Sequence, residues 1–479
     1  MLEIELLRRG GIVAVVLVAL GGCTSSGSDD DGSVDGTSSG GAETQGPTSM
    51  GPATSDGSSG GTGGSTGVGP DDTTADPTGD TGADSTGGEP ACPEAACTGW
   101  GWQLPNVNSE GTAVAVDGIG NVVAVGHQRG TGYGYVFKHA PDGSLTWTDS
   151  YAAAGAAGAY MAAVAIDSQD RIAVGGYDIG PLFEPTPFVR RLAPDGSEQW
   201  KWTYDEKTLQ QRSIVDLAIA PDDGVIGLVT FAQTSLDDVY ASAIVMLDEN
   251  GVEQSLVDVD FGLSARVNSM ELDGAQNILV SATARDAGGD PVGARVIKLD
   301  PAGTTVWNVE IHGADVFANG MAIDAADAIF VVGTTTVPVD GAPILGPRDT
   351  YVTKVSADGV PEWTVMIATD GDELSGSIVL DVDGNVWVMG TTDGTFEGQT
   401  SGGADDFFFR KLDPDGNTLW TRQVGSMPQP AGMGFELGDA LAVGCDGNVY
   451  FTAASSGNLF DMVDVLDRSI VTGQICEPR

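Results

Sequence analysis

The chain has 479 residues and a formal net charge of −47 at neutral pH, because it contains 68 Asp and Glu residues but only 21 Lys and Arg residues. A negative excess of this size repels nucleic acid and anionic lipid surfaces, which excludes both as electrostatic partners. Cations, basic proteins and neutral glycans remain as partner classes.

Residues 1–22 have the pattern of an export signal. Arg8 and Arg9 precede an apolar run, Gly10–Leu20, and the run ends in Leu20-Gly21-Gly22-Cys23. The run is about half as long as the roughly 20 residues of a membrane-spanning helix, so we expect a signal peptide that is removed. A Leu three residues before a Cys, with two small residues between, resembles the lipobox of bacterial lipoproteins. The resemblance implies that the Cys23 thiol is lipidated and becomes the first residue of the mature chain.

The predicted location is the outer membrane or the cell surface. Ser25 stands at the second position after Cys23, where lipoproteins retained in the inner membrane of enteric bacteria have Asp. An ordinary secretory signal with a chance cysteine is the alternative.

Residues 23–90 are predicted to be the lipidated Cys and a disordered linker. After Cys23 the segment consists almost exclusively of Gly, Ser, Thr, Asp and Pro, with no aromatic residue, no Lys or Arg, and 12 acidic residues. It has too little apolar surface to offset the entropy lost on folding. We expect a flexible tether that holds the domain at 91–479 away from the membrane.

This domain contains an internal repeat. A frame of 15 residues with a central turn recurs six times without a gap, at 133–147, 186–200, 241–255, 293–307, 349–363 and 406–420. The frames end at Trp147, Trp200, Ser255, Trp307, Trp363 and Trp420. Seven further hairpin patterns, such as Ala113–Gly126 and Ser377–Gly390, have a turn of Asp, Gly or Asn between two apolar runs.

Two hairpins per unit of about 50 residues give a four-stranded sheet, the size of a propeller blade. One such sheet cannot bury both of its faces alone, so neighbouring blades must stack in a ring. A closed ring also removes exposed sheet edges. The predicted fold class is therefore all-β, a seven-bladed β-propeller preceded by a lipoprotein signal peptide and a disordered linker.

The two ends of the domain are predicted to close the ring. The seventh unit has a hairpin at 440–453 and a third strand expected near 461–467, but it lacks the frame that ends in Trp. Thr98–Leu104 contains Trp100 and Trp102 and is expected to supply the missing strand.

Four cysteines, Cys92, Cys97, Cys445 and Cys476, lie around this closure. An even set in an exported protein predicts disulfides. Of the three pairings that are open, we favour Cys92 with Cys97 and Cys445 with Cys476. A metal site is the alternative for these thiols.

The frames Lys411–Trp420 (KLDPDGNTLW) and Asp381–Gly390 (DVDGNVWVMG) resemble the propeller repeats of bacterial secreted proteins known as SBBP repeats. This resemblance implies a propeller without a defined reaction. The Gly-x-x-x-Trp spacing, as in Gly143 to Trp147, also resembles the blade-docking motif of quinoprotein propellers and of an outer-membrane-assembly lipoprotein. A Trp in such a motif is expected to pack between blades, which is a structural role. The vicinal cysteine pair of quinone-binding dehydrogenases is absent.

Calcium is the one cofactor that the sequence suggests. Two turns carry alternating oxygen ligands, namely Asp381, Asp383 and Asn385, and Asp413, Asp415 and Asn417. Asx turns within hairpins are the favoured interpretation, so no cofactor is predicted and calcium is the alternative. The three histidines, His127, His139 and His312, are expected at the surface or at strand ends of different blades, without a catalytic partner.

Three functions remain open. The leading hypothesis is a non-enzymatic envelope lipoprotein whose propeller binds a protein or glycan. The second is a carbohydrate-active propeller enzyme, which would require carboxylates with shifted pKa in the central funnel. The third is a structural scaffold for outer-membrane assembly, which would require an exposed apolar groove on the blade sides.

Overall fold

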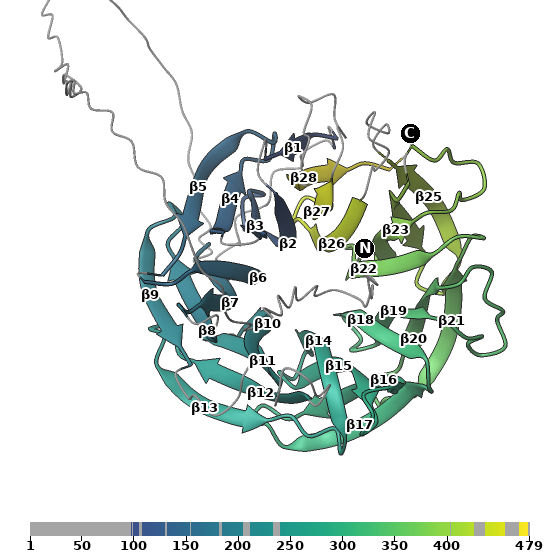
Figure 1. Cartoon of the computed structure of the whole chain (residues 1–479), viewed down its shortest axis with the longest axis horizontal. Helices are drawn as coiled ribbons and strands as arrows, with labels where there is room; N and C mark the ends of the chain where they lie inside the picture. The colour runs from purple at the N-terminus through teal and green to yellow at the C-terminus, as the bar shows by residue number, and fades with distance from the viewer. Residues whose placement is uncertain are drawn as a thin grey trace, which may run out of the picture. The chain divides into compact units, whose positions relative to one another are not determined.

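A computed structural model describes residues 97–477 except 98, 105–107, 130–131, 154, 182–183, 205–210, 233–239, 403, 426–435 and 456–468. These residues belong to the second of two compact units, Asp84–Arg479. Within them the chain forms 28 strands in seven four-stranded antiparallel sheets, arranged as blades around one axis (Figure 1). The predicted seven-bladed propeller is thus confirmed. No helix in the described part of the chain is long and apolar enough to span a membrane.

Each blade runs from an innermost strand at the axis to an outermost strand at the rim. Blade 1 has β2 (Ser109–Val116), β3 (Val122–Gln128), β4 (Gly134–His139) and β5 (Leu145–Tyr151); blade 2 has β6 (Gly158–Ile166), β7 (Ile172–Ile179), β8 (Pro185–Leu192) and β9 (Glu198–Thr203); blade 3 has β10 (Gln211–Ile219), β11 (Val225–Ala232), β12 (Tyr240–Leu247) and β13 (Glu253–Asp258). Blade 4 has β14 (Ser264–Leu272), β15 (Ile278–Arg285), β16 (Pro291–Leu299) and β17 (Thr305–His312); blade 5 has β18 (Val316–Ile323), β19 (Ile329–Thr335), β20 (Asp349–Val355) and β21 (Pro361–Ile367); blade 6 has β22 (Glu373–Leu380), β23 (Val386–Thr392), β24 (Asp406–Leu412) and β25 (Thr418–Val424).

Blade 7 combines both ends of the domain. Its inner strands are β26 (Glu436–Val443), β27 (Val449–Ser455) and β28 (Ser469–Ile475), and its outermost strand is β1 (Gly101–Gln103). β1 pairs antiparallel with β28, with Trp102 opposite Thr472. The predicted closure by the N-terminal strand is therefore confirmed. The third strand begins at Ser469, so its predicted position at 461–467 is wrong, and those residues lie outside the described part of the chain.

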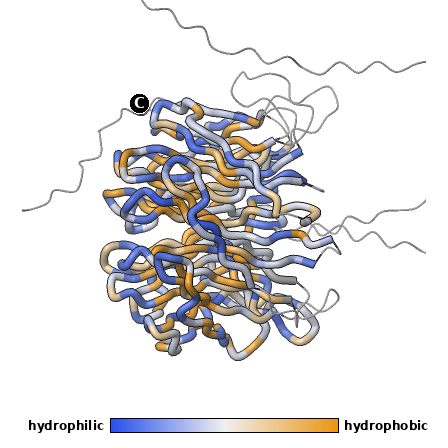
Figure 2. The backbone as a smooth tube through the Cα atoms, turned by 90° about the vertical axis from the view of Figure 1, so that its left-hand side faces the viewer, coloured by the Kyte–Doolittle hydropathy of each residue, from blue (hydrophilic) through white to orange (hydrophobic). Residues whose placement is uncertain are grey.

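Apolar side chains fill the spaces between blades. The middle strands are almost wholly buried, as in β19 and β23, because each packs between two neighbouring sheets. Figure 2 views the ring edge-on, with many hydrophilic residues at the tight turns on its left side. This pattern explains why the strands read as near-continuous apolar runs interrupted by Asp, Asn and Gly.

The Trp residues of the repeat frames pack on the glycines of the next blade. A Cβ added to Gly143, which has φ of +83°, would lie 2.5 Å from the indole of Trp100, and one added to Gly251 would lie 2.5 Å from the indole of Trp200. The indole thus covers a peptide that only glycine leaves accessible, and glycine also permits the positive φ of this turn. We call the contacts between adjacent blades seams. The predicted packing role of the Gly-x-x-x-Trp motif is confirmed at these seams.

A disulfide joins Cys97 to Cys476 across the closure. The favoured pairing of Cys92 with Cys97 and of Cys445 with Cys476 is therefore wrong. Cys445 is itself disulfide-bonded, whereas Cys92 lies outside the described residues. The physical reason for the Cys97–Cys476 pairing is the register of β1 on β28.

That register places the disulfide where the other blades have a turn. In blade 1 a backbone hydrogen bond of 2.9 Å from Ala140 to Ser144 closes the turn between the third and fourth strands. In blade 7 these two strands come from opposite ends of the domain, so no turn connects them. Counted from the strand pairs, Cys476 and Cys97 occupy the positions of Ala140 and Ser144. A covalent bond takes the place of the missing turn.

Removing this bond should destabilise the ring. We expect the double variant Cys97→Ser/Cys476→Ser to lose about 2–5 kcal/mol of unfolding free energy, because the bond links residues 379 positions apart and restricts the unfolded chain. Denaturant unfolding under oxidising conditions measures the change. An unfolding midpoint equal to that of the unmodified chain would show that β1 and β28 hold the closure without the disulfide.

Candidate binding groove between blades 3 and 4

A recurring set of three side chains supports most seams. An Asp in the first turn of the blade pairs with a Lys or Arg on the third strand, and a Trp on the fourth strand lies opposite that cation. We call this the Asp–cation–Trp set. The ion pairs and their distances are Asp117 with Lys138 (2.9 Å), Asp167 with Arg191 (2.5 Å), Asp273 with Lys298 (2.7 Å) and Asp381 with Lys411 (2.9 Å).

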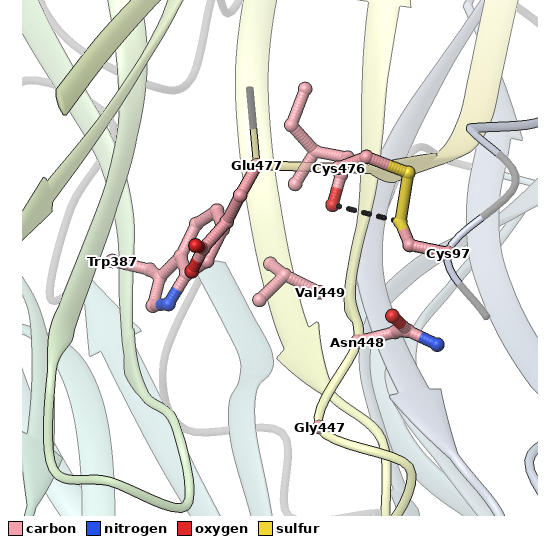
Figure 3. Close-up of a pocket in the computed structure, with 8 residues that line it drawn as sticks. Cys97, Trp387, Gly447, Asn448, Val449, Cys476 and Glu477 are labelled. Carbon is pink, nitrogen blue, oxygen red and sulfur yellow. Dashed lines mark hydrogen bonds between the residues drawn. A yellow bond between two sulfur atoms is a disulfide. The ribbon is translucent and has the colours of Figure 1, made fainter. Parts of the chain in front are cut away.

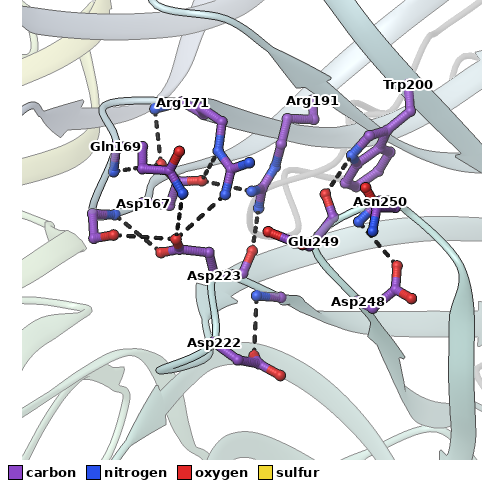
Figure 4. A network of polar contacts seen from close by, with 12 residues as sticks. Asp167, Gln169, Arg171, Arg191, Trp200, Asp222, Asp223, Asp248, Glu249 and Asn250 are labelled. Carbon is purple, nitrogen blue, oxygen red and sulfur yellow. Dashed lines mark hydrogen bonds and ion pairs between the residues drawn. The ribbon is translucent and has the colours of Figure 1, made fainter.

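The seam between blades 2 and 3 shows the complete set (Figure 4). Arg191 is fully buried, pairs with Asp167, and donates a hydrogen bond of 2.9 Å to the backbone carbonyl of Asp223 in blade 3. The indole N–H of Trp200 donates to the backbone carbonyl of Glu249 at 2.9 Å. Arg191 Nη2 and the indole N–H of Trp200 therefore both donate to turn carbonyls of the next blade.

Blade 3 has replaced all three members of the set. Ala220 stands where the Asp would be, Met246 takes the place of the cation, and Ser255 lies opposite Met246 at the Trp position. Next to these residues a groove of about 460 Å³ lies between blades 3 and 4. We call it the blade 3–4 groove. Its lining residues are Ala220, Pro221, Asp222, Ile226, Met246, Leu247, Asp248, Gln254, Gln276, Ile278 and Pro301.

The blade 3–4 groove has an apolar interior and a polar rim. Ile226, Leu247 and Ile278 are buried at its base, and Met246 is partly exposed. Asp222 is exposed at the rim, so it can meet a cationic group of a ligand. The volume is within the range of roughly 300–1,000 Å³ that is typical of ligand sites.

A second cavity, of about 280 Å³, lies where blades 6 and 7 meet beside the Cys97–Cys476 disulfide (Figure 3). Trp387 and Glu477 line it. Here the turn that would receive Trp420 is missing, and the buried indole N–H of Trp420 has no hydrogen-bond partner among the described residues. Both cavities thus lie at seams that lack part of the repeated packing.

Two carboxyl groups with shifted pKa lie on innermost strands of the same two blades. Asp216 on β10 accepts hydrogen bonds of 2.8 Å from the amides of Leu217 and Met270. Burial raises the pKa of Asp216 to about 6. Burial and the neighbouring Asp216 charge raise the pKa of Glu271, on β14, to about 8. Asp216 and Glu271 are both partly exposed. This is expected for residues on innermost strands, which line the axis of the ring.

The enzyme hypothesis requires carboxylates with shifted pKa, and Asp216 and Glu271 meet that part of the requirement. Near neutral pH Asp216 is mostly ionised and Glu271 mostly protonated, so the two groups could act as base and acid. The backbone amides that bind Asp216 also give it a structural role, because they connect β10 to β14 across the seam.

The six calcium candidates lie in two turns of blade 6. Asp381 accepts hydrogen bonds from the amides of Asp383 and Asn385 and pairs with Lys411. Asp413 accepts in the same way from the amides of Asp415 and Asn417. Both are therefore Asx turns. At Asp381 the Lys411 ammonium pairs with the carboxylate oxygen that a calcium ion would need. No cluster of three or more His, Cys, Asp or Glu suited to a metal occurs among the described residues.

The three histidines are buried residues at or near strand ends. His127 and His139 both belong to blade 1, so the expectation of three different blades is wrong. Burial lowers the pKa of all three, that of His139 to about 4. His139 packs against Trp100 and Trp102, which gives it a role in the closure.

Neither Cys23 nor Cys92 lies within the described residues, so lipidation of Cys23 stays a prediction.

No protein-family model matches the chain, and no curated protein matches it. The resemblances to SBBP and quinoprotein repeats therefore stay predictions. Similar solved structures include a protein of unknown function from Bacteroides caccae (12% identity, TM-score 0.40, 66% of this chain and 94% of that one) and the polysaccharide lyase Uly1 (12%, 0.46, 78% and 90%). The Dos1 propeller is another (8%, 0.45, 78% and 95%). Likenesses this distant carry no information on function.

Sequence reasoning missed both the blade 3–4 groove and the acidic pair. Ser255 was visible as the exception among six frame ends, but the matching changes at Ala220 and Met246 gain meaning only once the three positions are known to be neighbours. Asp216 and Glu271 are single acids within apolar strands, and this is the one signal that could have drawn attention to them.

Glu271 should make stability pH-dependent. Its pKa is raised from 4.5 to about 8 in the folded protein, so between these values the folded state holds a proton that the unfolded state has lost. The free energy of unfolding should therefore fall as pH rises through this window, by an amount on the order of a few kcal/mol, and Asp216 adds to the fall in the same direction.

Glu271→Gln should flatten this dependence between about pH 5 and pH 8, as measured by urea unfolding. Glu397→Gln, at an exposed loop position, is the matched control and should keep the slope of the unmodified chain. Equal slopes in both variants would refute the assignment.

Proposed function

We propose that this chain is an exported, lipid-anchored propeller that binds a protein of the cell envelope without chemical conversion. The observation that carries this proposal is the blade 3–4 groove. It combines an apolar base of Ile226, Leu247 and Ile278 with acidic residues at its rim, a composition suited to a protein ligand. Of the three hypotheses from the sequence, the assembly scaffold is the one that expects an exposed apolar groove, and the lining residues of this groove come largely from turns between strands.

Display from a membrane supports the same proposal. The signal peptide and lipobox predict an anchor at Cys23, and the acidic linker to residue 90 would allow the ring to reach partners in its surroundings. The net charge of −47 favours partners with basic surfaces.

A carbohydrate-active enzyme is the second candidate, and the Asp216–Glu271 pair is the observation that favours it. An enzyme of this kind should lose its activity on an envelope or matrix polysaccharide when either Asp216→Asn or Glu271→Gln is introduced. Binding at the groove should survive both changes, because neither residue lines the groove.

The anchor can be tested in the native bacterium. Cys23→Ser should move the protein from the membrane fraction to the soluble exported fraction and abolish labelling by a fatty-acid analogue. Ser25→Ala is the control and should leave both unchanged. Membrane retention and labelling of the Cys23→Ser protein would rule out lipidation at this residue.

Binding can be tested by crosslinking and recovery from labelled envelopes, with calcium and with a chelator. We expect the full-length chain to recover a defined protein, and the filled-groove variant Ala220→Asp/Met246→Lys/Ser255→Trp to lose it. Recovery of the same protein by the filled-groove variant would contradict the groove assignment. Recovery of no protein in either condition would contradict the binding function. A difference between calcium and chelator would implicate the turns of Asp381 and Asp413.

A further inference from the structure

The other seams show what kind of group the blade 3–4 groove can accept. At the seams between blades 7 and 1, 1 and 2, and 2 and 3, the indole contacts a turn glycine and its N–H donates to a backbone carbonyl of the same turn. The donors are Trp100 to Pro141 at 3.1 Å and Trp147 to Pro194 at 3.1 Å. At these three seams the turn is thus a preformed receptor for an indole.

Blade 4 keeps the backbone of this turn although blade 3 offers no indole. Pro301 and Gly303 occupy the positions of Pro194 and Gly196, and Gly303 retains a φ of +85°. Val257 covers Gly303, because an added Cβ would lie 2.5 Å from its methyl group, so the glycine is already packed and Pro301 is the part of the turn that borders the groove. Pro301 borders the groove together with Met246.

We propose that the blade 3–4 groove binds a tryptophan side chain of a partner protein that carries Lys or Arg next to it in sequence. This inference rests on the proposed protein-binding function and names the chemistry of the bound segment. The indole would cover Met246 and Ile278 and donate its N–H at the Pro301 turn. The basic neighbour would lie against Asp222 and Asp248 on the rim. Position 246, where most other blades have Lys or Arg, is a methionine, so the chain places no cation of its own there.

The bound segment comes from another molecule. The linker at 24–90 contains no aromatic residue and no Lys or Arg, so it has neither of the two groups required. Charge complementarity to a chain of net charge −47 also favours a basic partner over a second copy of this acidic chain.

The test uses the full-length protein in detergent and a short peptide, acetyl-Gly-Lys-Trp-Lys-Gly-amide, with fluorinated Trp observed by fluorine NMR. We expect saturable broadening and shift of the fluorine signal. Replacing Lys by Glu in the peptide should weaken binding by roughly tenfold or more, because the rim is acidic.

Ser255→Trp is the decisive variant, because it restores the chain's own indole beside the groove. It should raise the melting temperature and abolish peptide binding. Ser150→Trp, which adds an indole at an exposed position of the outermost strand of blade 1, is the matched control and should bind the peptide as the unmodified chain does. Unchanged binding by Ser255→Trp, or equal affinity for the Glu peptide, would overturn the inference.

The outcomes separate this inference from the proposed function. Loss of the envelope partner in the filled-groove variant, without any binding of the Trp peptide, would leave the function standing and refute the indole ligand. A concentration-dependent dimer of the unmodified chain that Ser255→Trp dissolves in sedimentation experiments would instead make a second copy the ligand and overturn the assignment to a partner protein.

Discussion

The constraint on which this structure depends is that every blade must bury both faces of its sheet. The middle strands are apolar on both sides, so each blade requires a neighbour on either side, and a linear array would leave two faces exposed to water. Closure of the ring removes both exposed faces at once. The pairing of β1 with β28 is the contact that completes it, since without β1 blade 7 would have three strands and would leave the Gly143 turn of blade 1 without Trp100.

Within that ring the seams are built from one repeated solution, and its exceptions are informative. The Asp–cation–Trp set buries charges that are costly unless paired, and at Lys138 and Arg191 the cation also donates to a carbonyl of the next blade. Blade 3 lacks the Asp, the cation and the indole together, so no buried charge is left unpaired there. This joint loss leaves an apolar surface and open volume. Loss of the Trp alone, with the Asp and the cation kept, would have left a buried Lys or Arg beside the cavity.

The sequence allowed the blades, their number and the closing strand to be predicted, because alternating turns and apolar runs depend on local chemistry that repeats six or seven times. The disulfide pairing was not predictable in this way. Spacing favoured near neighbours, whereas the register of β1 on β28 brings Cys97 to Cys476. The groove and the Asp216–Glu271 pair depend on contacts between blades, and those become apparent only when residues about 50 positions apart are placed side by side. Burial of His127 and His139 likewise follows from packing against Tyr160 and Trp100, which no local pattern encodes.

The position of the disulfide has a mechanical consequence. Any tension carried along the chain from residues before Cys97 enters the ring at its outermost and shortest strand, β1, which has three residues and would peel from β28 one hydrogen bond at a time. The covalent bond to Cys476 diverts that force into the end of β28, where seven paired residues must shear together. A ring held by its N-terminal end can thus be pulled without peeling β1 from β28.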